Sequence, residues 1–160
     1  GAINLGLTDK LILAFPHVKV LARPELIINE EDLNPHWVSG FTEGDGSFTF
    51  NMANFTASYE IILHSRDKPL LLKIIKFFGS KGSVGFYGVQ TSAKYRITTR
   101  SDLHTLIIPH FEKYPLSGVK LKNYRIWREM VELATNKLHL TAEGKAKLIE
   151  LKSTLNKDTY

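Results

Sequence analysis

The residues best suited to chemistry stand in one stretch, residues 34–47, which ends in Gly44-Asp45-Gly46-Ser47. Asn34 is a good N-cap and Pro35 suits the first helical position, so we expect a helix to begin here. The glycines end that helix, which places the Asp45 carboxylate at its C-terminus. The helix dipole disfavours a carboxylate there by up to about 1 kcal/mol, and a bound metal ion is one group that would compensate for it.

Two interpretations of Asp45 are open on these residues alone. An Asp-Gly pair is a common turn before a strand, and a carboxylate at a helix end is also a candidate metal ligand. A calcium-binding EF-hand loop is excluded. With Gly46 at the sixth position of such a loop, Phe41 and Met52 would occupy the first and twelfth positions, and neither binds calcium.

Two glycines mark one face of the same helix. Gly40 and Gly44 stand four residues apart and therefore lie on the same side. An isolated glycine in a helix costs about 1 kcal/mol relative to alanine. Close approach of another backbone is a plausible compensation for that cost.

The composition limits the classes of protein. The chain has 160 residues, a net charge of +5 and a pI near 9.4, which suits a polyanionic partner without proving one. It has no cysteine, which excludes disulfides, thiolate zinc sites and cysteine nucleophiles. No apolar run approaches the ~18 residues of a membrane span and no signal peptide is recognised, so we expect neither a membrane protein nor a secreted one. We expect a lead-in helix and linker over residues 1–33 and a single domain over residues 34–160.

Hydrophobic periodicity predicts an α+β domain with a four-stranded antiparallel sheet. The expected helices cover residues 7–16, 34–44, 68–78, 101–109, 120–134 and 141–155, and the expected strands cover about 47–52, 57–65, 83–89 and 94–100. Segment 18–28 is expected as an edge segment or linker, because Pro24 lies inside it. Side-chain caps are expected at Asp67, Ser101 and Thr141. The expected core positions of two helices are Leu71, Leu72, Ile75 and Phe78, and Tyr124, Trp127, Val131 and Leu133, with His104 and His110 as structural residues.

One face of the predicted sheet is polar and basic. Residues 79–101 contain no acidic residue and four basic ones, which are Lys81, Lys94, Arg96 and Arg100. A solvated face of an antiparallel sheet explains this pattern. A surface that contacts phosphates and base edges explains it as well.

Two motifs resemble those of the LAGLIDADG homing endonucleases. Val38-Ser-Gly-Phe-Thr-Glu-Gly-Asp-Gly46 is similar to the motif that names the family, and Tyr114-Pro-Leu-Ser-Gly-Val-Lys120 is similar to a turn that carries a basic residue near the scissile phosphates. The resemblance implies an αββαββα core over most of residues 34–135, with a four-stranded antiparallel DNA-binding sheet and helices on its other face. The lead-in resembles the connector before the second motif of single-chain, two-motif enzymes.

The resemblance also implies an activity, which is site-specific hydrolysis of double-stranded DNA. Asp45, with the Gly44 carbonyl, would bind Mg²⁺, and Ca²⁺ or Mn²⁺ would fit the same site. Lys120 would stabilise negative charge. The family often has a polar residue at the end of the second strand, where this chain has Leu63, so either His64 substitutes or the position is vacant. Glu43 is expected to be structural.

The partners implied by the resemblance are DNA and a second LAGLIDADG domain. The motif helices would pack together, in a homodimer or with a complementary half, through Val38, Gly40, Phe41 and Gly44. The expected DNA contacts are Ser47, Thr49, Asn51, Glu60, Ile62, Arg66, Ser83, Tyr87, Lys94, Arg96 and Thr98. Location in a mitochondrion or another organelle follows from the resemblance alone.

Two other functions are open on the same fold. An RNA-binding intron maturase would tolerate Asp45→Asn, whereas the nuclease would not. A purely structural or ribosome-associated protein is disfavoured, because Gly44, Asp45 and Lys120 are all present.

Overall fold

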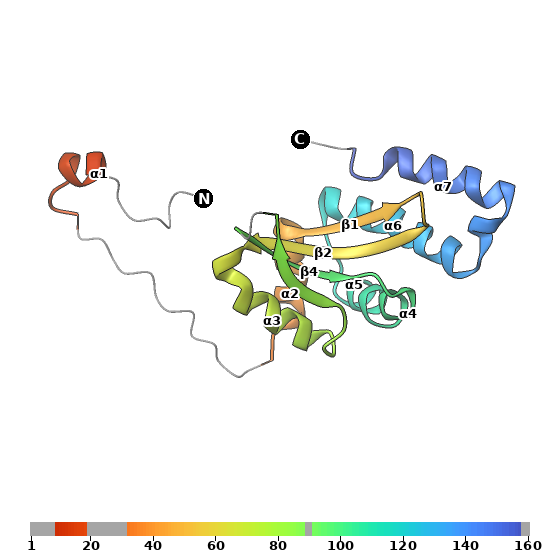
Figure 1. Ribbon diagram of the computed structural model, residues 1–160, viewed down its shortest axis with the longest axis horizontal. Helices are drawn as coiled ribbons and strands as arrows, with labels where there is room; N and C mark the ends of the chain where they lie inside the picture. Colours follow the sequence, from red (N-terminus) through yellow and green to blue (C-terminus); the bar gives the residue numbers. More distant parts are fainter. Residues whose placement is uncertain (1–8, 19–31, 89–90, 158–160) are drawn as a thin grey trace. The chain divides into compact units, whose positions relative to one another are not determined.

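The computed structural model describes residues 9–18, 32–88 and 91–157, and the chain divides into two compact units between residues 31 and 32 (Figure 1). Each unit is described by itself. In the first, α1 (Asp9–Ala14) confirms the middle of the predicted helix over residues 7–16. The edge segment or linker predicted over residues 18–28 lies outside the described residues from residue 19 onward.

The second unit is built on the predicted four-stranded antiparallel sheet. Its strands are β1 (Gly46–Asn51), β2 (Thr56–His64), β3 (Ser83–Tyr87) and β4 (Ser92–Ile97), in the order β1-β2-β4-β3. The register aligns one row across all four strands, made of Ser47, Glu60, Arg96 and Ser83. Alternation buries one face, as predicted, through Phe48, Phe50, Tyr59, Ile61, Tyr95 and Ile97.

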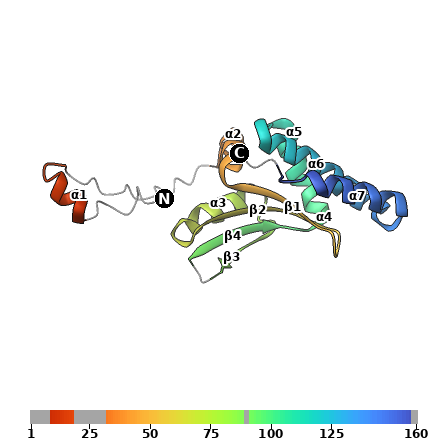
Figure 2. The same ribbon diagram turned by 90° about the horizontal axis from the view of Figure 1, so that it is seen from above.

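The helices are α2 (Pro35–Asp45), α3 (Lys68–Phe77), α4 (Arg100–Asp102), α5 (Ile108–Lys113), α6 (Gly118–Thr135) and α7 (Ala142–Thr154), with a π-helical turn at Leu103–Ile107 and 3-10 turns at Ser65–Asp67 and Leu138–Leu140. Figure 2 shows the helices of this unit gathered on one side of the sheet. No helix in the described residues is long and apolar enough to cross a bilayer.

The predicted core stripes are largely confirmed. Tyr124, Trp127 and Val131 of α6 are buried, whereas Leu133 is half-buried. In α3 one assignment was wrong, because Leu72 is 51% exposed and Ile74 is buried in its place. A residue at i+3 from Leu71 shares its face, whereas a residue at i+1 is turned about 100° away.

Helix boundaries follow the predictions less closely. Thr141 accepts a hydrogen bond from the Gly144 amide and caps α7 as predicted. Asp67 makes no capping hydrogen bond with its side chain and forms an ion pair with Arg66. Thr99, not Ser101, is the N-cap of α4.

The helix expected to stop near Pro109 continues past it. In the π-helical turn the Ile108 amide donates to the Leu103 carbonyl, so α5 begins afresh with Pro109 in its first turn. Amides in a first turn have no intrahelical partner, and a proline there forfeits no hydrogen bond.

Candidate active site and nucleic-acid interface

The motif helix begins and ends on specific contacts. At its start, Asn34 Oδ1 accepts a hydrogen bond from the His36 amide at 2.9 Å, which confirms the predicted cap. At its end, Gly44 and Asp45 are exposed, and the Gly46 amide donates to the Thr42 carbonyl. The Asp45 carboxylate therefore lies at the open end of α2, directly before β1.

Thr42 ties this end of the helix to the sheet. Its hydroxyl donates to the Val38 carbonyl at 2.8 Å, so at 2.7 Å it accepts from the Tyr59 hydroxyl of β2. Burial raises the pKa of Tyr59, which keeps this donor protonated. A Cβ at Gly46 would lie 2.4 Å from Thr42 Cγ2 and 2.8 Å from the Thr42 carbonyl oxygen, so this close approach requires glycine.

The start of α6 meets the end of α2. Lys120 Nζ donates to the Gly46 carbonyl at 2.5 Å, and the Glu43 carboxylate accepts from the Ser117 amide. Glu43 thus serves the structural role expected for it, and Lys120 lies beside the residue that follows Asp45. A cavity of about 390 Å³ lies beside these contacts, and it is lined by Glu43, Gly44, Ser117, Gly118, Val119, Lys120, Asn123 and Asn156.

Sequence reasoning missed two residues of this cavity. The Asn156 amide donates to Asn123 Oδ1, and Asn156 Nδ2 donates to the Phe48 carbonyl of β1, both at 2.9 Å. Asn123 could have been predicted from the sequence, because it is polar and stands three residues after Lys120, on the same face of α6. Asn156 could not have been predicted in this way, because its contact is with β1, 108 residues away in the sequence.

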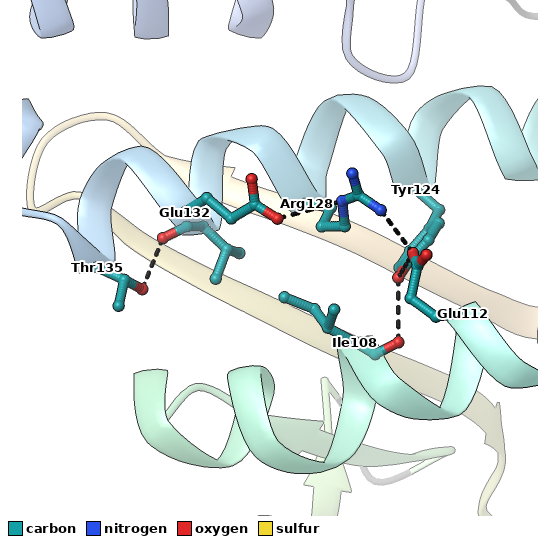
Figure 3. Close-up of polar contacts among 7 residues, drawn as sticks. Ile108, Glu112, Tyr124, Arg128, Glu132 and Thr135 are labelled. Carbon is teal, nitrogen blue, oxygen red and sulfur yellow. Dashed lines mark hydrogen bonds and ion pairs between the residues drawn. The ribbon is translucent and has the colours of Figure 1, made fainter.

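Polar groups between α5 and α6 hold α6 in place (Figure 3). The Tyr124 hydroxyl lies 3.2 Å from the Ile108 carbonyl oxygen and 2.8 Å from Glu112 Oε1, and Arg128 Nη1 donates to that same Oε1 at 2.7 Å. Arg128 also pairs with Glu132. The hydrogen bond from Arg128 lowers the pKa of Glu112, and burial raises the pKa of Tyr124.

A buried histidine, His110, helps to hold α2 in place. Ser39 Oγ donates to the Tyr114 carbonyl at 2.7 Å, so at 3.2 Å it accepts from His110 Nε2, which fixes the tautomer. Burial lowers the pKa of His110 to about 4. The expectation that His110 is structural is confirmed, whereas His104 is exposed.

The helix-free face of the sheet carries the predicted polar side chains, but not all of the predicted charge. Lys94 and Arg96 form ion pairs with Glu60 at 3.1 and 2.8 Å. Arg100 does not point from the sheet, because its guanidinium donates to the carbonyls of Ala134 and Phe55. It stabilises the fold and adds nothing to the basic face.

The other predicted contact residues are spread over this face and its rim. Ser47, Ser83 and Thr98 are half-buried or exposed, Ile62 is exposed, and Thr49 shares a hydrogen bond with Ser58. Asn51 Oδ1 accepts from the Ala53 amide, and Arg66 lies in the turn after β2. The Tyr87 side chain lies outside the described residues.

His64, predicted to assist catalysis, has a structural contact. It lies exposed at the end of β2, and its Nδ1 accepts from the Arg66 amide at 3.2 Å, which caps the turn that follows. No cluster of three or more His, Asp or Glu side chains able to hold a metal ion occurs within the described ranges. Asp45 and the Gly44 carbonyl are hard oxygen donors that suit Mg²⁺, but Mg²⁺ usually takes one or two carboxylates.

The predicted association face of α2 needs one correction. Val38 is 1% exposed and belongs to the core of its own domain, so it has no surface to offer a partner. Trp37 is 42% exposed and stacks on Phe41, with ring centroids 4.9 Å apart. A Cβ added to Gly40 or Gly44 would meet nothing within 4 Å, so the face between them is open in this chain.

Comparison with known proteins agrees with this geometry. The family model of the LAGLIDADG endonucleases matches residues 38–131. This match covers more than half of the chain, which therefore belongs to the LAGLIDADG endonuclease family. A similar curated relative is "Probable intron-encoded endonuclease 3" of Neurospora crassa. It is 34% identical over an alignment of 152 residues that covers 90% of this chain and 28% of the relative.

Solved structures of the family have the same fold. The homing endonuclease I-GzeII, in complex with its DNA target, is 29% identical with a TM-score of 0.85, over 99% of this chain and 56% of that one. I-SmaMI, bound to uncleaved DNA target in the presence of calcium ions, is 32% identical with a TM-score of 0.84, over 98% and 55%. The chain thus spans about half the length of these enzymes and less of the curated relative.

Proposed function

We propose that this chain is one DNA-binding and DNA-cleaving domain of a homing endonuclease, which hydrolyses phosphodiesters at a specific double-stranded site. The observation that supports this most is the exposed Asp45 carboxylate at the end of α2, with the Lys120 ammonium beside the next residue. In the same domain, the sheet face that no helix covers carries Lys94 and Arg96. The DNA targets and the calcium ions named for the structural relatives support the same assignment.

The chemistry divides between the residues of this chain. Asp45 and the Gly44 carbonyl would hold a divalent ion, Mg²⁺ under working conditions, and such an ion supplies an activated water and charge stabilisation. The Lys120 ammonium would stabilise charge that develops on the phosphate oxygens. Glu43 accepts from the amide that precedes α6, and Asn156 donates to β1. These contacts would keep Asp45 and Lys120 in position.

One carboxylate is too few for a complete site, so we propose that two domains act together. A second copy or a complementary half would bring its own Asp45 counterpart when the two motif helices pack through Trp37, Gly40, Phe41 and Gly44. Small residues on that face allow close approach. A homodimer implies a near-palindromic target, and a complementary half implies an asymmetric one.

The test combines mass and cleavage. Sedimentation gives the oligomeric state, and incubation of a randomised double-stranded DNA library with Mg²⁺ gives the cut sites, with Asp45→Asn as the control. We expect a dimer and site-specific cuts that the substitution abolishes. A monomer that binds DNA and never cuts contradicts the self-sufficient enzyme. Tight binding to structured RNA that persists in Asp45→Asn would favour the maturase instead.

Location rests on the family alone. We propose a mitochondrion or another organelle, which agrees with the intron-encoded origin named for the Neurospora relative. Imaging of the tagged chain in its source cells would test this.

A further inference from the structure

Glu60 lies at the centre of the helix-free face, among side chains that are otherwise neutral or basic. It is 8% exposed, on β2, and pairs in register with Ser47 on β1 and Arg96 on β4. A nearly buried carboxylate on a surface proposed to meet DNA is costly unless it is fully paired. The contacts of the Glu60 carboxylate therefore indicate its role.

The carboxylate oxygens of Glu60 are all engaged. Oε2 forms an ion pair with Lys94 Nζ at 3.1 Å. Oε1 forms an ion pair with Arg96 Nε at 2.8 Å and accepts a hydrogen bond from Ser58 Oγ at 2.9 Å. Because Ser58 donates to Glu60, it accepts from Thr49 Oγ1, 2.5 Å away. These hydrogen bonds orient the carboxylate, and the carboxylate forms an ion pair with Arg96.

The ion pair with Glu60 engages Nε of Arg96 and leaves the edge of the guanidinium that carries the two Nη groups. Its two Nη groups make no hydrogen bond or ion pair within the described part of the chain, and the side chain is 46% exposed. A guanidinium that is paired through Nε keeps its Nη fork available to a ligand. Two parallel donors match the adjacent O6 and N7 acceptors of guanine in the major groove, whereas adenine offers one acceptor and one donor there.

The place of Arg96 in the sheet favours a base over a phosphate. β2 and β4 are the two central strands, and neighbouring strands lie about 4.8 Å apart, so the central pair fits within the ~12 Å width of a major groove. Central residues then face the floor of the groove, where the base edges are. Edge strands face the phosphate walls.

We infer that Arg96 reads one guanine in each half-site and that Glu60 is the positioning residue that aims it. This inference rests on the proposed function, because it requires the helix-free face to enter a major groove. It also assigns Glu60 a role other than a direct DNA contact. Its oxygens already contact three protein groups, and the residue is only 8% exposed, so it offers little surface to cytosine.

The test is selection of bound sequences from a randomised duplex library without divalent ions, followed by sequencing. The wild-type chain should enrich a guanine at one fixed position per half-site. Arg96→Lys keeps the charge and loses the fork, so it should reduce that preference roughly 5- to 150-fold and leave other positions unchanged. Arg125→Lys, on an exposed position of α6, is the matched control and should change nothing.

Glu60→Gln tests the positioning role. It should weaken the same guanine preference, and the unmasked charge should steepen the dependence of log affinity on log salt by about 1. Circular dichroism melting verifies that each variant is folded. If Arg96→Lys selects the same consensus and binds all sequences more weakly to the same degree, Arg96 contacts a phosphate. The inference then fails, and the proposed function stands. If the wild-type chain enriches no sequence, the proposed function fails with it.

Discussion

The Lys120 ammonium nitrogen lies 2.5 Å from the carbonyl oxygen of Gly46, the residue directly after Asp45. We therefore expect Lys120→Met to lower single-turnover cleavage by about 10²- to 10³-fold, the usual effect of losing one group that stabilises transition-state charge. DNA affinity should change only a few-fold. Lys122→Met on the same helix is the control for removal of charge. Cleavage at the wild-type rate in Lys120→Met would exclude Lys120 from the chemistry.

The open face of α2 predicts opposite effects on folding and on association. Gly40→Ala should stabilise the single domain by up to about 1 kcal/mol, because alanine favours the helix and its Cβ meets nothing within 4 Å. Gly40→Leu should fold equally well and fail to dimerise, as measured by sedimentation. Gly46→Ala is the contrasting variant, since its Cβ would collide with Thr42 and destabilise the fold. A fully dimeric Gly40→Leu would place the interface elsewhere.

His110 predicts a loss of stability in mild acid. Burial, with a smaller effect from His36, lowers its pKa from 6.5 to about 4, so between these values the unfolded chain binds a proton that the folded chain does not. The contribution of His110 to the free energy of unfolding is full above pH 6.5. It falls as the pH drops toward 4, by up to roughly 3 kcal/mol. Urea unfolding at a series of pH values measures this. His110→Gln should flatten the profile in that window, whereas His104→Gln, at an exposed position, should leave it unchanged.

The Tyr124 hydroxyl predicts a modest effect on stability. Tyr124→Phe removes the contacts to Ile108 and Glu112 and should lower the free energy of unfolding by about 1 to 2 kcal/mol. Thermal unfolding measures it. Combining this substitution with Glu112→Gln forms a double-mutant cycle, in which a coupling near zero would show that the hydroxyl and the carboxylate do not support each other.

Local signals predicted much of the fold. Asn34 and Pro35 marked the start of α2, and alternation around Phe48 and Phe50 marked the buried face of β1, because caps and periodicity depend on neighbours in sequence. The end of α5 was not predicted. Pro109 is a helix breaker by local rules, and only the preceding π-helical turn, which forms in the packed domain, lets the helix restart at it.

The candidate site was predictable where a motif carried it. Asp45 and Lys120 stand in such motifs, and the fold brings their segments together. Glu60 was placed on the correct face, but its two ion pairs depend on the register between β2 and β4, which alternation alone does not fix. Val38 was predicted to contact a second motif helix, but it is 1% exposed and packs in the core of its own domain.

The carbonyls of Gly46 and Phe48 accept hydrogen bonds from Lys120 and Asn156, and β1 is an edge strand of the sheet. Alternate carbonyls of a strand point the same way, so the two side chains occupy the free edge that could otherwise recruit a strand from another molecule. The Lys120 and Asn156 side chains thus also hinder the addition of a strand from another molecule to β1. Variants at Lys120 or Asn156 carry a risk of aggregation unrelated to catalysis, and their solubility should be measured before their rates.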